Sequence, residues 1–264
     1  MSYPIEAMVD GVETEVPTPG NSGDQLDVSD PRIRELLDTN PVVRKIVEEN
    51  GLLFEQFRSQ IDSKKLEEAK YISALHIIEA LGLDPLIEGM YNKRKFNDQL
   101  RAEIGRARRS GTPLSVFLLD ADGFGQINKT HGHLEGDRTI VAMGKMVIGS
   151  IRINDIGAHW GGDEFGVILP DTGCVEATMV AFRLLNAVPS VAPDYATLTA
   201  SIGVAEFDPK DDDNDSLFKR ADTVLRAAKE FGKDQIVIAG TANQDLSIES
   251  LDAGIQNKVT LVHK

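Results

Sequence analysis

The stretch that most constrains this chain is residues 161–165, where two glycines and two acids separate two apolar runs. Residues 151–160 and 165–169 contain side chains that favour strands, and Gly161 and Gly162 permit backbone conformations that other residues resist. The pattern predicts a strand, a tight turn and a second strand. Backbone amides and the adjacent carboxylates of Asp163 and Glu164 could hold a phosphate and its metal ion there. Taken alone, such a pattern is more often only a hairpin turn.

Charge divides the chain unevenly. The chain has 264 residues, enough for one full domain and a smaller one. Its net charge is −14. The first 30 residues contain seven acids and no Lys or Arg. We expect residues 1–30 to be a disordered acidic tail, because they also have few large apolar side chains. A nucleic-acid surface needs clustered Lys and Arg, so the charge argues against a nucleic-acid partner.

Cysteine content and hydropathy bear on location. The single cysteine, Cys174, excludes an internal disulfide and is compatible with a reducing compartment. We expect it to lie in a loop or at the start of a helix, without a chemical role. The sequence opens with no secretory leader and shows no apolar run near 18 residues, so the prediction is a cytoplasmic protein with no membrane contact.

Residues 31–81 are expected to be a small all-helical region, a regulatory or dimerisation module. Pro31 suits the first position of a helix, and apolar residues then recur at helical spacing. The apolar stripe is wide for so few helices to bury alone, which favours a dimer contact or a protein partner bound through residues 1–81. A helical bundle that covers its own core is the alternative. His76 is expected to be a packing residue.

Residues 82–240 mix strands and helices without strict alternation, which predicts an α+β domain with a mainly antiparallel central sheet flanked by helices. Beside the hairpin, strands are expected at 114–119, 197–207 and 235–239, and helices at 91–109, 134–151, 175–188 and 216–231. The strand at 235–239 is taken as the last one. Residues 241–264 are a C-terminal extension with one weak helical stretch and no assigned role. Asp211, Asp212 and Asp213 are expected to be a solvated like-charge loop.

The acids of the chain suggest a metal site. Asp120 follows a strand, and a strand end and a hairpin turn can meet at one edge of a sheet, so Asp120 and Asp163 could share hard cations through oxygen. Mg²⁺ suits so few protein ligands, and two metals about 4 Å apart could activate a hydroxyl and support a leaving pyrophosphate. A calcium loop starting at Asp120 is rejected, because Phe124 and His131 occupy its fifth and twelfth positions.

These motifs occur in combination, and from about residue 84 to 240 the sequence resembles the GGDEF domains of bacterial diguanylate cyclases. The similar stretches are Asp84-Pro85-Leu86 with Gly89-Met90-Tyr91-Asn92 one residue late, Leu119-Asp120-Ala121-Asp122-Gly123-Phe124, Ile127-Asn128, Gly132-His133 with Gly136-Asp137, the signature at 161–165, Ser201-Ile202-Gly203-Val204, Ala221-Asp222, Lys229 and Gly232. The resemblance implies a nucleotidyl-cyclase-like fold. It also implies a reaction in which two GTP become cyclic di-GMP and two pyrophosphates, with the active species a homodimer.

The resemblance also implies residue roles. Asp120, the carbonyl of Ala121 and Asp163 would bind Mg²⁺, with Mn²⁺ as an alternative ion. Asp163 would be the base for the 3′-hydroxyl, and Glu164 would support the metal site. The remaining roles fall to substrate-binding residues: Asn128 and Asp137 for guanine, Gly161 and Gly162 for phosphate through their amides, and Lys229 and Lys233 for the triphosphate.

A further pair, Arg152 and Asp155, lies at the spacing of the family's inhibitory product site, which implies feedback by cyclic di-GMP. Arg183 is a weaker candidate for the same site.

Several positions depart from the family pattern. Gly125 stands where a Lys is usual, Lys129 where an Asp is usual, and His159 and Lys233 where Arg is usual. The carboxylates expected to hold the metal are complete, so catalysis is favoured, at a reduced rate. The alternative is a catalytically weak or inactive module that senses GTP or cyclic di-GMP and signals to a partner protein.

Overall fold

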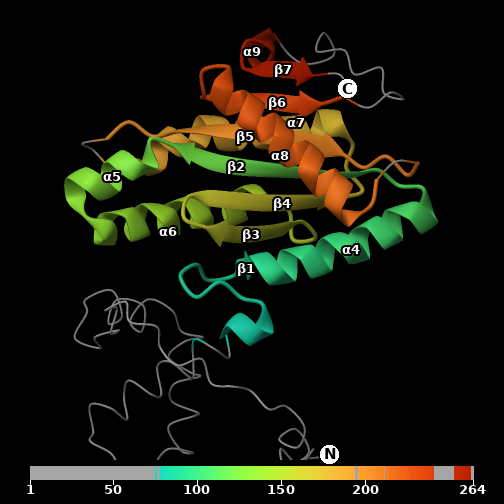
Figure 1. Cartoon of the computed structure of the whole chain (residues 1–264), viewed down its shortest axis with the longest axis horizontal. Coiled ribbons are helices and arrows are strands. Elements are labelled where there is room, and N and C mark those ends of the chain that lie inside the picture. The colour runs from blue at the N-terminus through green and yellow to red at the C-terminus, as the bar shows by residue number, and fades with distance from the viewer. Residues whose placement is uncertain (1–74, 76–77, 194–195, 211, 241–252, 263–264) are drawn as a thin grey trace, which may run out of the picture.

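The structure is a computed structural model that describes residues 75, 78–193, 196–210, 212–240 and 253–262 (Figure 1). The predictions for the acidic tail, for most of residues 31–81 including His76, and for residues 241–252 lie outside the described residues. Residues 78–81, at the end of the expected helical region, are helical.

The described residues form strands and helices in a mixed order. Their bounds are β1 Tyr91–Asn92, α4 Lys93–Ser110, β2 Leu114–Asp122, α5 Phe124–His131, α6 His133–Ser150, β3 Ile156–Gly161, β4 Glu164–Pro170, α7 Cys174–Ala187, η3 Val188–Val191, β5 Thr199–Glu206, α8 Asn214–Glu230, β6 Gln235–Ala239, α9 Ala253–Gln256 and β7 Val259–Val262.

One sheet unites all these strands in the order β1-β3-β4-β2-β5-β6-β7. The inner pairings, β3 with β4, β4 with β2 and β2 with β5, are antiparallel, whereas β1–β3, β5–β6 and β6–β7 are parallel. The predicted α+β class is confirmed, with an antiparallel centre and parallel edges.

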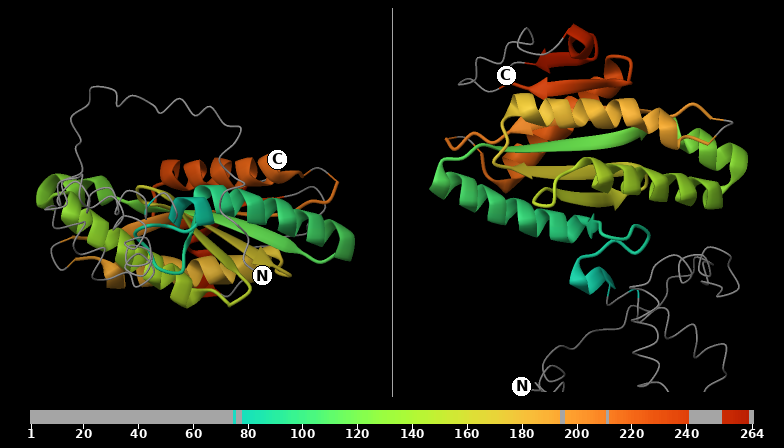
Figure 2. Two further views of the ribbon diagram at one scale, coloured as in Figure 1. Left: turned by 90° about the horizontal axis from the view of Figure 1, so that it is seen from below. Right: turned by 180° about the vertical axis from the view of Figure 1, so that it is seen from behind.

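Helices cover both faces of the sheet (Figures 1 and 2). On one face, α4 and α8 pack over a core that includes Phe96, Leu100 and Leu225, and on the other α6 and α7 pack over a core that includes Met143 and Leu184. All nine residues of β2 are buried, because this strand lies in the middle of the sheet with helices above and below. Its end therefore opens onto one edge of a rigid core.

The prediction that residues 235–239 form the last strand is wrong. β7 adds a parallel edge strand beside β6, with Val259 opposite Ile236. Its four residues, Val-Thr-Leu-Val, favour a strand. An edge strand is short and only partly buried, so its apolar pattern is weak in the sequence. The last residues described in the extension thus complete the sheet.

The sequence predicts no helix at Phe124–His131, where the structure has α5. It has only eight residues, and Gly125 lowers its helical propensity. Its apolar side chains, Phe124 and Ile127, are buried in the core under α6, and this tertiary packing stabilises a segment too short to be helical alone.

Helix α7 confirms the expected position of Cys174 at the start of a helix, and it also bears on the prediction of no membrane contact. Cys174 is the first residue of α7, and burial raises the pKa of its thiol to about 12. Among the described residues, the stretch Cys174–Val191 is long and apolar enough to cross a membrane by length and composition, contrary to the expectation of no apolar run near 18 residues. Ala177, Ala181 and Leu184 are buried against the sheet, so packing in the core accounts for this composition.

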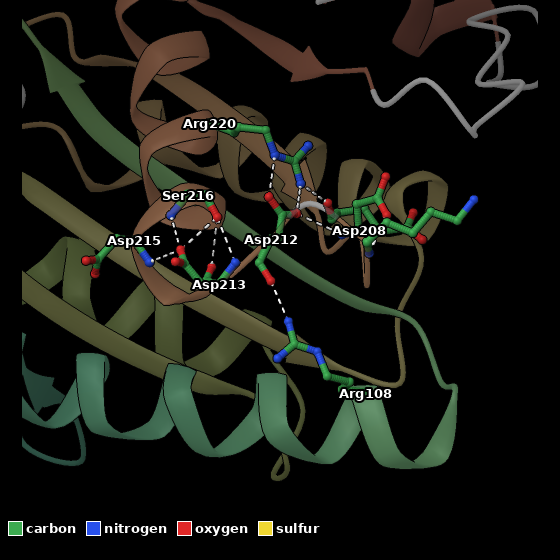
Figure 3. Close-up of polar contacts among 9 residues, drawn as sticks. Arg108, Asp208, Asp212, Asp213, Asp215, Ser216 and Arg220 are labelled. Atoms are coloured by element: carbon green, nitrogen blue, oxygen red, sulfur yellow. Dashed lines mark hydrogen bonds and ion pairs between the residues drawn. The ribbon is translucent and has the colours of Figure 1, made fainter.

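The prediction that residues 211–213 are a solvated loop is wrong for Asp212, which is 4% exposed. Figure 3 shows Asp212 between Arg220 and Arg108. Arg220 from α8 forms an ion pair with its carboxylate, Arg108 from α4 donates to its backbone carbonyl at 2.6 Å, and its Oδ2 accepts from the amide of Asp208 at 2.7 Å. Asp213 caps α8 by accepting from the amides of the first turn. Asp212 therefore joins two helices to the loop that follows β5.

Replacing Asp212 by Ala should destabilise the fold by about 3–5 kcal/mol, because it leaves the Arg220 guanidinium buried without its counter-charge. The free energy of unfolding in urea measures this. Asp213→Asn is the matched control, since it also removes one negative charge from the loop but replaces one good capping residue by another. Equal stability of Asp212→Ala and wild type would contradict the structural role given to this pair.

Candidate active site

The turn between β3 and β4 is as tight as the sequence predicts. Gly161 and Gly162 have φ of 122° and 62°, in the region that side chains rarely adopt, and a Cβ at either would meet nothing within 4 Å. Glycine is thus required by the backbone conformation and not by a lack of space. A shift in the register at residue 160 adds a bulge just before the turn. The result is a short exposed loop with unobstructed amides.

The end of β2 and this turn meet, as expected. Asp120 lies directly opposite Glu164 in the antiparallel pairing of β2 with β4, and the amide of Ala121 donates to the carbonyl of Asp163 at 3.2 Å. Opposite residues of an antiparallel pair place their side chains on the same face. The carboxylates of Asp120 and Glu164 therefore share the face covered by α8, with Asp163 at the adjoining turn.

Lys229, near the end of α8, is the cation of this cluster. Its Nζ lies 2.6 Å from Asp120 Oδ2, and its side chain is 36% exposed. Burial raises the pKa of Asp120, while the hydrogen bond from Lys229 opposes the rise and the neighbouring Asp163 carboxylate adds to it. Lys229 therefore partly offsets the free-energy cost of burying the ionised carboxylate of Asp120.

Asp163 shows the same balance. Burial raises its pKa above the ordinary range for a carboxyl group, and the nearby Glu164 and Asp122 add to the rise, although Lys229 opposes it. Two carboxyl groups with raised pKa values thus lie at one edge of the sheet. A site of this kind has a strong electrostatic tendency to bind a cation or a proton.

Asp122 has a role that the sequence did not reveal. Its carboxylate accepts from the hydroxyls of Ser201 at 2.8 Å and Thr199 at 3.0 Å on β5, and from the amide of Asp234 at 3.1 Å. Because three donors already bind its two oxygens, Asp122 is less suited than Asp120 to bind an ion. It ties the end of β2 to β5 and to the loop after α8, which holds Lys233 exposed at a φ of 66°.

Asn128 of α5 lies against Gly136 of α6. A Cβ on Gly136 would come within 1.9 Å of Asn128 Oδ1, so glycine at this helical position leaves the space that the amide occupies. The same Oδ1 is buried and has no hydrogen-bond partner among the residues that the structure describes. Asp137, half-buried, is the next residue along α6. The predicted guanine-binding pair thus belongs to two helices in direct contact.

Arg152 and Asp155 lie in the loop between α6 and β3. The amide of Arg152 donates to Asp155 Oδ2 at 2.7 Å, and the side chain of Arg152 is exposed. Burial raises the pKa of Asp155, and the charges of Arg152 and Arg183 oppose this rise. Arg183, which donates to the Ser150 carbonyl at 3.1 Å, therefore lies near enough to belong to this cluster.

A cavity of about 310 Å³ opens beside Glu164, under α4 and α8. Its wall includes Trp160, which stacks on Phe218 with ring centres 4.4 Å apart, and Lys93, whose Nζ lies 4.3 Å from the centre of the Trp160 rings. The aromatic residue directly before the signature, Trp160, thus packs against α8, the helix that carries Lys229.

Comparisons with known proteins identify the family. Residues 83–235 match the family model for the diguanylate cyclase GGDEF domain. The chain belongs to the GGDEF family. It is 32% identical over 187 residues to the response regulator PleD of Caulobacter vibrioides, covering 68% of this chain and 41% of that protein. It is 33% identical over 154 residues to the probable diguanylate cyclase DgcC of Escherichia coli, covering 57% and 42%. The chain thus spans less than half the length of these relatives.

Solved structures of GGDEF proteins share the fold. The GGDEF domain of DgcB from Caulobacter crescentus, solved in complex with c-di-GMP, matches with a TM-score of 0.56 and 27% identity over 60% of this chain and 95% of that one. The diguanylate cyclase SiaD of Pseudomonas aeruginosa, solved with its activator SiaC, matches with a TM-score of 0.55 and 31% identity over 78% and 83%.

Replacing Lys229 by Met should raise the pKa of Asp120 further in the metal-free protein, because the lysine now lowers it through a hydrogen bond and its charge. A ¹³C titration of the aspartate carboxyl groups measures this. Lys219→Met is the control, since Lys219 is an exposed lysine near the other end of α8. An unchanged Asp120 titration in Lys229→Met would contradict the ion pair.

Proposed function

We propose that this chain is a diguanylate cyclase, which condenses two GTP into cyclic di-GMP and two pyrophosphates. The observation that carries the proposal is the convergence of Asp120, Asp163 and Glu164 with Lys229 at one edge of the sheet. Membership of the GGDEF family supports the same reaction. In each of its two steps a 3′-oxygen forms a bond to an α-phosphorus, and the bond from that phosphorus to pyrophosphate breaks.

The residues of the site fit a magnesium ion, with Mn²⁺ as the alternative. All its donors are oxygens: the carboxylates of Asp120 and Asp163 and the carbonyl of Ala121. Among the described residues, no three His, Cys, Asp or Glu side chains form a preformed metal cage. This suits Mg²⁺, which usually takes one or two carboxylates and completes its shell with water and substrate phosphates. When bound, the ion would neutralise the charge that develops on the reacting phosphates.

The chain's own groups would act around that ion. Asp163 would take the proton of the 3′-hydroxyl, which its raised pKa favours, because a stronger base accepts a proton more readily. Glu164 would support the metal site from the adjacent strand. Lys229 would leave Asp120 and neutralise the triphosphate together with Lys233. The amides of Gly161 and Gly162 would donate to phosphate oxygens.

Guanine would be read by Asn128 and Asp137. A carboxylate accepts from guanine N1–H and N2–H₂, which adenine lacks, and an amide can serve the remaining edge. The close contact of Asn128 with Gly136 supports this role, because it holds the amide in one place.

A homodimer would be the active species. One site holds one GTP, and each 3′-hydroxyl must attack the α-phosphate of the other nucleotide, so two sites must face each other. Arg152 and Asp155 would bind cyclic di-GMP as an inhibitory product, since a planar guanidinium can stack on and hydrogen-bond guanine. We place this activity in the cytoplasm, with GTP and cyclic di-GMP as ligands and neither nucleic acid nor membrane as a partner.

Gly125 favours a second candidate, a weak or inactive module that senses GTP or cyclic di-GMP and signals to a partner protein through residues 1–81. Its position on α5 has open space around it and no side chain to stabilise phosphate charge. Losing one such contact costs roughly 10²–10³-fold in comparable sites, which lowers activity without abolishing it. We therefore place the cyclase first. SiaD, which was solved with its activator, is a relative with a protein partner.

The purified chain should convert GTP to cyclic di-GMP in the presence of Mg²⁺, with a specific activity that rises with protein concentration as dimers form. Asp163→Ala should lose about 10²–10⁴-fold in turnover, because it removes the base and a metal ligand. Chromatography of the products measures both. Full activity of Asp163→Ala would contradict the assignment of the base, and no product from wild type at any concentration would favour the sensing module.

Replacing Gly136 by Ala should weaken binding of a non-hydrolysable GTP analogue about tenfold or more, because the new methyl group would displace the Asn128 amide and a lost hydrogen bond costs about 1–3 kcal/mol. Calorimetry measures this. Gly149→Ala on the same helix is the matched control: its Cβ meets nothing within 4 Å, and it should leave binding unchanged while adding up to about 1 kcal/mol of stability. Equal affinity in both variants would remove Asn128 from the guanine site.

Arg152→Ala should bind cyclic di-GMP more weakly than wild type and show less inhibition by it, with turnover at low product unchanged. Titration with cyclic di-GMP and initial rates at rising product measure these two effects. Arg138→Ala, which removes an exposed arginine from α6, is the control. Product binding that is unaffected by Arg152→Ala would remove the feedback site.

A further inference from the structure

His159 lies in an unusual position for a titratable side chain. It is on β3 two residues before the glycines of the turn, and only 7% of it is exposed. Its ring packs against Phe165 of β4 with ring centres 5.3 Å apart, and Asn92 of β1 lies opposite it in the parallel pairing. Neighbouring strands on both sides thus fix the ring in place.

Both ring nitrogens face groups that can only accept hydrogen bonds. Nδ1 lies 2.7 Å from Asp84 Oδ2, and Nε2 lies 3.0 Å from the carbonyl oxygen of Gly162. A neutral imidazole carries one N–H and can therefore satisfy only one of them. The imidazolium carries two and satisfies both. The geometry therefore matches the protonated ring.

Further hydrogen bonds hold the side chain of Asp84 in this orientation. Its other oxygen, Oδ1, accepts from the amides of Leu86 at 2.9 Å and Ile87 at 2.8 Å, which holds the turn that leads into β1. Asp84 is 6% exposed, and its own amide donates to the Met90 carbonyl at 2.9 Å. His159 thus links two turns: the one that follows residues 78–81 and the one that carries Asp163.

We propose that His159 is a positioning residue, whose protonated ring holds the active-site turn at residues 161–163 against the segment that leads into the domain, so that the placement of the turn depends on pH. His159 acts through the Gly162 carbonyl and touches no reacting atom in the proposed reaction. The effect on turnover rests on the proposed cyclase function, whereas the effect on the turn does not.

The charges around the ring determine the sign of the effect. Asp84 from the leading segment and Asp163 from the turn are both acidic, and together with the Gly162 carbonyl they raise the pKa of His159 even though burial lowers it. Asn92 and Phe165, from the strands on either side, are uncharged. Below this raised pKa both bonds form. As the pH rises through it, the ring loses one N–H, and either Asp84 or Gly162 loses its donor.

Two variants separate this role from a merely structural one. His159→Arg supplies several N–H donors and stays charged at every accessible pH, so it should hold the turn without titrating. Asp84→Asn removes the carboxylate that stabilises the imidazolium, so it should lower the pKa of His159. His131→Gln is the control, since His131 is an exposed histidine at the end of α5.

The experiment is an NMR titration of the full chain without nucleotide, following the His159 ring and the amides of Gly161 and Gly162. We expect the two amides to shift along the single-proton curve of His159, the shift to move to lower pH in Asp84→Asn, and no such shift in His159→Arg. The proposal would be overturned if the two amide shifts did not change as His159 titrates, or if the ring titrated as in the unfolded chain.

Turnover of GTP against pH is the second readout. Wild type and His131→Gln should lose activity as the pH rises through the pKa of His159. His159→Arg should not show this fall in turnover. The same fall in turnover in His159→Arg would overturn the link between His159 protonation and turnover. A chain whose turn titrates as expected but which makes no cyclic di-GMP would instead refute the cyclase function and leave the role of His159 intact.

Discussion

The structure of the site depends on the register between β2 and β4. This pairing sets Asp120 opposite Glu164 and brings the amide of Ala121 to the Asp163 carbonyl. A slip of one residue would move every side chain of a strand to the other face of the sheet, so Asp120 would leave the face that α8 covers. All of β2 is buried, so a slip would also force the cores on both sides of the sheet to repack. The site is thus specified by the packing of the core.

Much of this could be predicted from the sequence. The hairpin was predictable because few structures other than a strand, a tight turn and a strand fit two glycines and two acids between apolar runs. The pairing of Asp120 with the turn was predictable because each ends or joins a strand. What escaped prediction depends on contacts over long sequence separations: Asp122 with Ser201 of β5, and His159 with Asp84. The edge strand β7 and the buried Asp212 escaped for another reason, since short or charged segments give little apolar signal and acquire their environment only from tertiary packing.

The same interactions explain why the departures from the family pattern need not abolish function. Gly125 removes a cation from the surface of α5, but Lys229 lies 2.6 Å from Asp120, at the centre of the carboxylate cluster. His159 is neutral or charged according to pH where an arginine would always be charged, and it keeps a bond to each of its acceptors only in the charged form. The carboxylates remain, and the charges that orient and neutralise around them are fewer and more dependent on conditions.

We propose that the end of β2 and the turn after β3 form one site for a divalent cation and GTP. Electron paramagnetic resonance of Mn²⁺ with a non-hydrolysable GTP analogue tests it most directly. We expect a protein-bound Mn²⁺ signal with wild type. For Asp120→Asn we expect the Mn²⁺ affinity to fall by at least roughly 10–100-fold, because a direct ligand should matter no less than the residues that only hydrogen-bond to ligands, whose loss costs that much. Equal Mn²⁺ and nucleotide binding by wild type and Asp120→Asn would contradict the claim.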